Sequence, residues 1–241
     1  ESEHNFTILV ANFAVIIKAD DLLCSEDGMY DGWNRYFDYL GQNNITGTAG
    51  IVGNSIYDND ICRDSFAELK EKEYIEFWNH GWTHHLSENE TEFRGPSQST
   101  QLESLNRTQR LIYEWTGKRS RSFGAPGNAF DNSTCEILSQ ADGIRYWLLG
   151  RDGCGVHNLG NYVSVEQTTG DVNFDYYNRN MNGSNQSSPY FTIQIHPKLW
   201  EVGNIDEFDL IIQDLIQRGA VFVSAEELGL MITSTIITPP R

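Results

Sequence analysis

Short hydrophobic runs alternate with longer segments of helical periodicity along most of the chain. The runs are rich in β-branched and aromatic residues and lie at 13–19, 47–52, 74–78, 120–124, 143–149, 162–166, 190–196 and 220–223. Apolar residues recur at helical spacing over 32–40, 60–72, 99–116, 132–140 and 205–218. This alternation is typical of parallel strands joined by crossover helices. It predicts an α/β fold, and eight strand candidates favour a barrel.

The segment at 205–218 shows the helical pattern most clearly. Its apolar residues recur at i, i+3 and i+4 positions, namely Ile205, Phe208, Ile211, Ile212 and Leu215. This spacing places them on one face of a helix, and we expect that face to pack on the sheet.

Two stretches interrupt the alternation. Residues 150–188 are polar and rich in Gly, Asn and Tyr, so we expect a long loop region there with a single strand at 162–166. Residues 233–241 contain paired prolines and predict a trailing linker. The 241 residues suffice for one substantial core, and we expect a single domain over residues 1–232.

The charge balance excludes some partners. Thirty-four acidic residues against 17 basic ones give a formal net charge of −17, which repels phosphate backbones and anionic lipids. We therefore expect no nucleic-acid partner, and we interpret the acidity, which is spread along the chain, as a solvated surface. No run of 18 apolar residues is present, so no membrane span is expected. The pattern specifies no oligomeric state.

The cysteines and the glycosylation sequons are two indicators of the cellular compartment in which the protein folds. Cys24, Cys62, Cys135 and Cys154 form no C-x-x-C pair, which argues against zinc-finger and thioredoxin motifs. They are structural thiols or form one to two disulfides, with three pairings open. The seven N-x-[ST] sequons mark either a secreted glycoprotein or an Asn-rich, Ser/Thr-rich surface, and we favour the second interpretation.

A histidine-rich segment follows the strand candidate at 74–78. It has the sequence NHGWTHH over residues 79–85 and holds three of the six histidines. Two imidazoles four positions apart can converge on one metal ion, so His80 and His84 are the natural pair. The alternative is that these histidines only cap a strand and face solvent.

An acidic pair, Asp20 and Asp21, follows the first strand candidate. Adjacent carboxylates at a strand end point to opposite sides, so one can bind a metal ion while the other acts as a base. The pair alone could be an ordinary Asp-rich turn. The histidine segment favours the functional interpretation.

Together these segments resemble the NodB-like polysaccharide deacetylases, the family 4 carbohydrate esterases. The first two motifs of that family are an Asp-Asp pair and two histidines spaced as His80 and His84. Residues 122–128 (SFGAPGN) resemble its third motif, and 193–197 (IQIHP) resemble its late strand, which ends in a catalytic histidine, here His196. The resemblance covers residues 10–232 and implies a distorted (β/α) barrel with the site at the C-terminal ends of the strands.

The resemblance implies a metal-dependent hydrolase that removes acetyl groups from a carbohydrate polymer or oligosaccharide. Asp21, His80 and His84 would bind one divalent ion, Zn²⁺, because two imidazoles and one carboxylate leave a position for water. His85 would not be a ligand.

The resemblance also implies the remaining catalytic roles. Asp20 would act as the general base, and His196 would protonate the leaving amine or alcohol. The backbone N–H of Gly127 would help to stabilise the oxyanion.

The third and fourth motifs depart from the family pattern. Gly124 stands where an arginine that orients the catalytic aspartate is expected, and no segment matches the Asp-containing fourth motif that tunes the late histidine. Lys18 is our candidate partner for Asp20, since residues two apart on a strand share a face and a buried lysine needs a carboxylate. Alternatively, its ammonium group reaches the barrel rim or pairs elsewhere.

Three tryptophans lie beside these motifs, and aromatic faces can stack on sugar rings. Trp200 is the favoured substrate-binding residue because it follows Pro197 near His196. Trp82 is expected to be pinned between the metal ligands and the barrel, and core packing is the alternative for all three, Trp147 included.

Two other functions remain open from the sequence. One is an allantoinase-like C–N hydrolase acting on a small amide, and the other is a catalytically silent carbohydrate-binding relative. The sequence does not distinguish N-acetyl from O-acetyl substrates. An acetylated carbohydrate as substrate implies a secreted or cell-envelope location.

Overall fold

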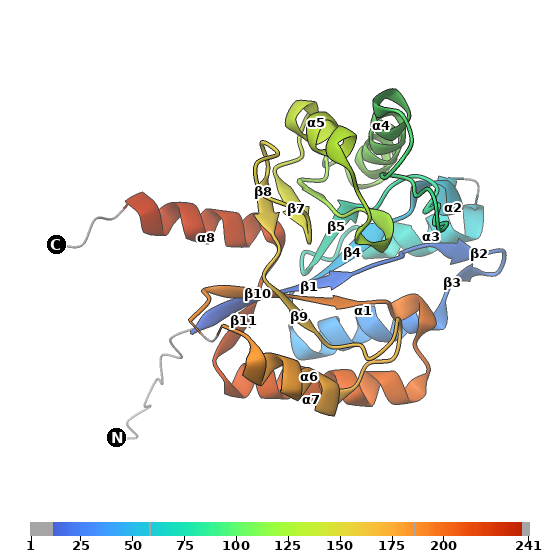
Figure 1. Cartoon of the computed structure of the whole chain (residues 1–241). Coiled ribbons are helices and arrows are strands. Elements are labelled where there is room, and N and C mark those ends of the chain that lie inside the picture. Colours follow the sequence, from blue (N-terminus) through green and yellow to red (C-terminus); the bar gives the residue numbers. More distant parts are fainter. Residues whose placement is uncertain (1–11, 58, 186, 238–241) are drawn as a thin grey trace, which may run out of the picture.

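Parallel strands form two adjoining sheets at the centre of the computed structural model, which describes residues 12–57, 59–185 and 187–237 (Figure 1). The first sheet has the order β11-β1-β10-β9 and consists of β1 (Phe13–Ala19), β9 (Tyr162–Ser164), β10 (Tyr190–Ile195) and β11 (Ala220–Phe222). The second runs β4-β5-β6-β7-β8 and consists of β4 (Gly47–Ile51), β5 (Ile75–Asn79), β6 (Ser122–Phe123), β7 (Tyr146–Leu148) and β8 (His157–Leu159). Every neighbouring pair in both sheets is parallel.

The two sheets meet just beyond the ends of β1 and β4. Leu22 forms a parallel bridge with Ile51. Its N–H donates to Gly50 O at 2.8 Å, and its carbonyl accepts from the N–H of Val52 at 3.0 Å. The sheets therefore curve into one distorted (β/α) barrel, which confirms the fold predicted from the sequence.

Eight α-helices of the described residues lie outside the barrel. They are α1 (Asp31–Asn43), α2 (Gly53–Tyr57), α3 (Asp60–Leu69), α4 (Gln98–Thr116), α5 (Asn132–Gln140), α6 (Phe174–Gly183), α7 (Val202–Gln217) and α8 (Ala225–Ile237). Two 3₁₀ turns, η1 (Pro126–Asn128) and η2 (Pro197–Leu199), and a small hairpin of β2 (Cys24–Ser25) and β3 (Gly28–Met29) complete the described elements. Figure 1 shows α1, α6 and α7 beside the first sheet, α4 and α5 beside the second, and α8 extending away from the barrel.

Burial on α7 explains how the helices attach. Phe208, Ile211, Ile212 and Leu215 are fully buried, and Ile205 is partly buried against the same cluster. The apolar stripe predicted from the periodicity is thus the face that packs on the barrel. Removing such a face from water is the main force that holds an amphipathic helix in place.

The eight predicted strands and five predicted helices are all present, most with shifted ends. The expected loop at 150–188 is wrong in part, because it also contains β8 and α6. On α6 the buried residues Tyr177 and Met181 lie four apart among polar neighbours, which is too few apolar positions to reveal a helix. α8 runs through Ile237 into the predicted linker, whose residues 238–241 lie outside the described residues.

The four cysteines pair as Cys24–Cys62 and Cys135–Cys154. The first disulfide joins the β2–β3 hairpin to α3, and the second joins α5 to the loop after β7. Of the three pairings left open by the sequence, the structure therefore forms the one that joins each cysteine to its neighbour along the chain.

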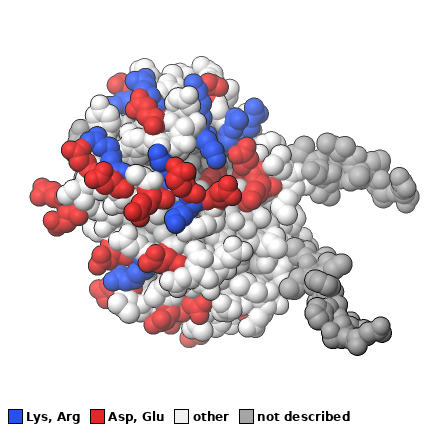
Figure 2. Space-filling view, turned by 180° about the vertical axis from the view of Figure 1, so that it is seen from behind, with Lys and Arg blue, Asp and Glu red and all other residues white. Residues whose placement is uncertain are grey.

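Charged side chains of both signs are interspersed over much of the face in Figure 2, beside a largely uncharged area at its lower right. This distribution fits the predicted solvated surface better than a single charged binding site. Within the described ranges, no helix combines the length and the apolar character that crossing a membrane requires.

Candidate active site

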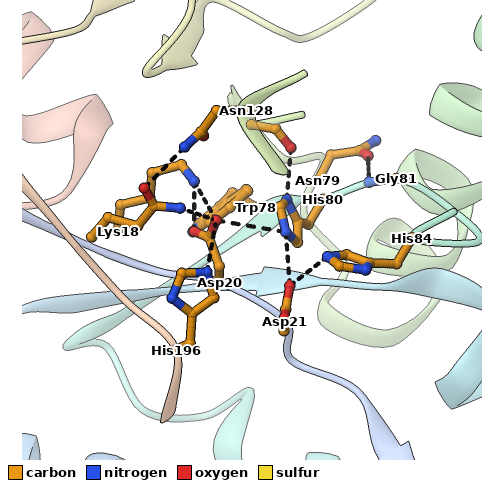
Figure 3. Close-up of polar contacts among 12 residues, drawn as sticks. Lys18, Asp20, Asp21, Trp78, Asn79, His80, Gly81, His84, Asn128 and His196 are labelled. Carbon is orange, nitrogen blue, oxygen red and sulfur yellow. Dashed lines mark hydrogen bonds and ion pairs between the residues drawn. The ribbon is translucent and has the colours of Figure 1, made fainter. Parts of the chain in front are cut away.

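The polar residues predicted as a site converge at the carboxyl ends of the strands. Asp20 and Asp21 directly follow β1, His80 follows β5 and His196 follows β10. Parallel strands bring their carboxyl ends to one face of a barrel, so residues far apart in sequence meet there. Figure 3 shows Asp20 between Lys18 and His196, with the side chains of Asp21 and His80 alongside.

Asp21, His80 and His84 form a compact trio. One potential ligand atom from each residue lies within 4.8 Å of the others. The Nε2 atoms of His80 and His84 lie 3.1 Å and 2.6 Å from Asp21 Oδ1 (Figure 3). One carboxylate and two imidazoles are a donor set that catalytic zinc sites use. His85 is exposed and lies outside the trio.

The backbone conformation and several hydrogen bonds orient the side chains of the trio. Asp21 adopts a left-handed conformation with φ of 64°, and its carbonyl accepts from Trp33 Nε1 at 3.0 Å. Burial disfavours the charged carboxylate, but hydrogen bonds from His80 and His84 outweigh it and hold the pKa of Asp21 well below its usual range. His80 Nδ1 lies 2.8 Å from Gly124 O, an orienting contact that leaves Nε2 for a metal ion.

Asp20 lies beside the trio and is fully enclosed. Lys18 Nζ donates to its Oδ1 at 2.6 Å and to its Oδ2 at 2.5 Å, and Gln194 Nε2 donates to Oδ2 at 2.7 Å. Lys18 is 0% exposed and Asp20 1% exposed, so this is a buried ion pair. The prediction that Lys18 pairs with Asp20 is confirmed.

Trp78 explains why Gly124 carries no side chain. A Cβ atom at Gly124 would lie 2.7 Å from the Trp78 ring and 3.1 Å from Lys18 Cε. The Lys18 ammonium in turn lies 5.2 Å from the centre of the Trp78 ring, within cation–π distance. The space where a longer side chain would enter is filled by these two residues.

His196 is positioned by Glu166. Its Nδ1 lies 2.6 Å from Glu166 Oε2, and its backbone N–H donates to Oε1 at 2.7 Å. His196 Nε2 lies 4.0 Å from Asp20 Oδ2. Burial lowers the pKa of His196, but the Glu166 hydrogen bond and the charges of Asp20, Glu166 and Asp21 outweigh it and raise the pKa above its ordinary value.

The sequence did not reveal Glu166 or Gln194. Glu166 is the last residue of a predicted strand that neighbours the His196 strand, so it occupies the same kind of position as Asp20. Its position at the end of a predicted strand was the available signal in the sequence. Its contact with His196, 30 residues further along the chain, could not be predicted. Glu166 makes the contact with His196 that we expected from an Asp-containing fourth motif.

Gly127 lies in the 3₁₀ turn after β6, with φ of 59°. Such a conformation favours glycine. The neighbouring Asn128 donates from Nδ2 to Gln194 Oε1 at 2.9 Å, which ties this turn to the Asp20 network (Figure 3).

The prediction that Trp200 stacks on a sugar is wrong. Its side chain is 4% exposed and packs against Tyr36 and Phe208, with ring centroids 6.0 and 5.1 Å away. Trp147 is also buried in the core. Trp82 belongs to the His80–His84 loop, is 8% exposed, and its ring packs against Tyr57.

Comparison with protein families identifies one match along the chain. A family model described as polysaccharide deacetylase matches residues 21–147, which include Asp21, His80 and His84. No curated protein matches the chain at a significant level.

Solved structures share the fold at low sequence identity. A family 4 acetyl xylan esterase from Clostridium thermocellum, in complex with cobalt, is 18% identical with a TM-score of 0.64, covering 90% of this chain and 91% of its own. The peptidoglycan deacetylase PdaC from Bacillus subtilis is 18% identical with a TM-score of 0.63 and 95% coverage of both chains. A family 4 pseudoenzyme from Bacillus anthracis is 15% identical with a TM-score of 0.62, covering 89% of this chain and 64% of its own.

Proposed function

Because the chain belongs to the polysaccharide deacetylase family and is a carbohydrate deacetylase, we propose that it hydrolyses an acetyl group at the site formed by Asp20, the metal-binding trio and His196. The observation that carries this assignment is the approach of one ligand atom each from Asp21, His80 and His84 to within 4.8 Å. A base and an acid beside a metal site are the parts that a hydrolytic deacetylation needs.

The donor set fits zinc. Zn²⁺ accepts imidazole nitrogen and carboxylate oxygen, and a catalytic site has three protein ligands and an open position. When bound, such an ion supplies Lewis acidity that polarises an acyl oxygen and makes water more acidic. Asp21, His80 and His84 would hold it, and the bond from His80 Nδ1 to Gly124 O would keep the ring in place.

Asp20 is the proposed general base. Its Oδ2 lies 3.7 Å from His80 Nε2, so the carboxylate borders the metal site without being one of the trio. Lys18 and Gln194 hold both of its oxygens, and they fix its orientation toward an incoming water. Positioned general-base catalysis typically contributes about 10²–10⁴-fold.

His196 is the proposed general acid. The contact with Glu166 orients the ring so that Nδ1 faces the carboxylate and Nε2 faces the site. Its raised pKa favours the protonated form that can donate to a departing amine or alcohol.

Gly127 is the proposed oxyanion-stabilising residue. It lies in the turn directly after β6, where a Cβ atom would meet Leu86 Cδ2 at 3.0 Å, and its backbone N–H would donate to the oxyanion of a bound acyl group. The buried ring of Trp200 is not part of this proposal, so sugar contacts must come from other residues at the rim.

We also propose that the protein acts outside the cytoplasm, in a secreted or cell-envelope location. Two cysteine pairs at disulfide distance support this, since disulfides persist in oxidising compartments. Six sequon asparagines in the described ranges are exposed, which is compatible with export, namely Asn44, Asn89, Asn106, Asn132, Asn182 and Asn185. A titration of denatured, unreduced protein that finds four free thiols would contradict export.

The decisive experiment measures acetate release from a panel of N-acetylated and O-acetylated oligosaccharides, with metal content determined in parallel. We expect release from at least one class, and the preferred class identifies the substrate. A small-amide hydrolase would instead act on allantoin-like amides, and a silent relative would bind the sugars without releasing acetate. His80→Ala should lose both metal and activity, and His85→Ala, the matched control, should keep both.

A further inference from the structure

The loop between the two histidines of the trio has an irregular backbone. Gly81 has φ of 81° and His84 has φ of 54°, both in the left-handed region. This conformation returns the His84 ring toward His80, with ring centroids 5.2 Å apart. A non-glycine residue such as His84 is held there only when other contacts specify it.

Those contacts come from Glu92. Its Oε1 accepts from the backbone N–H of Trp82 at 2.5 Å and of Thr83 at 3.0 Å, and its Oε2 accepts from the N–H of His84 at 2.7 Å. The hydroxyl of Ser104 also donates to Oε1. Three successive amides around one carboxylate form an anion-binding nest, and here the anion is part of the protein.

Glu92 is itself firmly placed. It is 6% exposed, and its own N–H donates to His85 O at 2.9 Å. A Cβ atom at Gly81 would lie 2.6 Å from Glu92 Oε2, so the carboxylate lies directly against the loop backbone. Glu92 therefore contacts the loop from Gly81 to His85 along its whole length.

Trp82 is held independently on its aromatic faces. Its ring lies 5.6 Å from the Tyr57 ring, and the Arg107 guanidinium lies 3.9 Å from its centre. The Trp82 side chain and the backbone of the loop are thus fixed by different residues. Among the described residues, Glu92 alone accepts from the amide of His84, which is a member of the trio.

We propose that Glu92 is a positioning residue that fixes His84 through the backbone of the loop and so sets the affinity of the metal site. This inference rests on the proposed metal site and adds a residue that neither the motifs nor the trio includes. Glu92 contacts no ligand side chain in the trio, so its effect passes through the backbone amides of residues 82–84.

The test is the Zn²⁺ affinity of the apoprotein, measured by competition with a chromophoric chelator. In Glu92→Gln one oxygen becomes an NH₂ group, so at least one amide of the nest meets a donor instead of an acceptor. We expect affinity to fall about 10–100-fold, the usual effect of losing an outer-shell partner of a metal ligand. Glu88→Gln makes the same change on an exposed residue of the same segment and should bind like the wild type.

Two further measurements separate a positioning effect from general loosening. Bound Co²⁺ should show altered visible bands in Glu92→Gln, because these bands depend on ligand geometry. In a His84→Ala background, Glu92→Gln should cause no additional loss of Zn²⁺ affinity. An equal loss in both backgrounds would overturn the proposal.

The remaining outcomes are also decisive. Wild-type protein that binds no Zn²⁺ would refute the proposed metal site, and the role of Glu92 with it. Wild-type binding that Glu92→Gln retains in full would refute the role of Glu92 alone. If circular dichroism shows that Glu92→Gln does not fold, Glu92→Asp keeps the charge but is too short to reach all three amides, and unchanged affinity in that variant would overturn the proposal.

Discussion

The two ends of the barrel each place a carboxylate at a central strand, fully buried for Asp20 and half-buried for Glu76, but they provide different partners for it. At the carboxyl end of β1, Asp20 is held by the Lys18 ammonium and by Gln194. Near the start of β5, Glu76 instead accepts from the Ser122 hydroxyl and from the N–H of Ala225 at the start of α8.

The partners decide what each carboxylate can do. Burial raises the pKa of Glu76 to about 7, because its neutral donors offset the loss of water only in part and the charges of Glu226 and Glu227 add to the rise. Lys18 and Gln194 hold Asp20 in one orientation beside the metal-binding trio, which suits it to receive a proton from a bound water. The raised pKa of Glu76 instead makes stability depend on pH.

The strongest test of the catalytic end is Asp20→Asn. We expect turnover to fall about 10²–10⁴-fold because the general base is lost, while metal content stays near that of the wild type. Elemental analysis and steady-state kinetics measure the two effects. Asp21→Asn is the control and should lose metal. If Asp20→Asn loses metal and Asp21→Asn does not, the two roles are reversed.

Lys18→Met tests the cationic partner. It leaves the buried Asp20 carboxylate without its counter-charge, which typically costs about 3–5 kcal/mol in the free energy of unfolding. Urea unfolding of the apoprotein measures this loss. The double variant Lys18→Met with Asp20→Asn should regain most of it, and a double variant no more stable than Lys18→Met would contradict the pairing.

Glu166→Gln tests the acid, His196. The acid must be protonated, so kcat/KM should fall as pH rises through the pKa of His196. Removing the Glu166 charge, while Asp20 and Asp21 remain, lowers that pKa, and the basic limb should move to lower pH. Glu114→Gln, on the exposed side of α4, should leave the limb in place. A basic limb that does not move would assign it to another group.

Glu76→Gln tests the other end of the barrel and should have the smallest effect. Between the ordinary carboxyl pKa of 4.5 and about 7, native Glu76 binds more protons than the unfolded chain, so wild-type stability falls as pH rises through this window. The variant lacks this dependence, so its Tm should improve relative to the wild type by about a few degrees from pH 5 to pH 8. Glu73→Gln, which is exposed, should show no such trend.

Residues at the ends of hydrophobic runs were the ones that the sequence could predict. Asp20, Asp21, His80 and His196 each follow such a run, and parallel strands necessarily gather these positions. His84 was predictable from its spacing to His80.

Contacts between distant segments were not predictable in the same way. Whether Trp200 is exposed depends on Tyr36 and Phe208, which only the packing of α1 and α7 brings against it. Glu166 needed the pairing of β9 with β10 before its contact with His196 could be seen. Burial and pairing are properties of the assembled barrel, and a local pattern carries little information about them.

Trp78 limits the mutational paths that are open to this site. Gly124→Arg would bring a Cβ atom against the Trp78 ring. It would also place a second cation beside Lys18, which already neutralises the Asp20 carboxylate. Replacing Lys18 first would leave Asp20 buried without a counter-charge, and shortening Trp78 first would open a cavity in the core. Each single step toward an arginine at position 124 is therefore unfavourable. The cation on β1 and the glycine after β6 form a combination that selection can leave only through several changes at once.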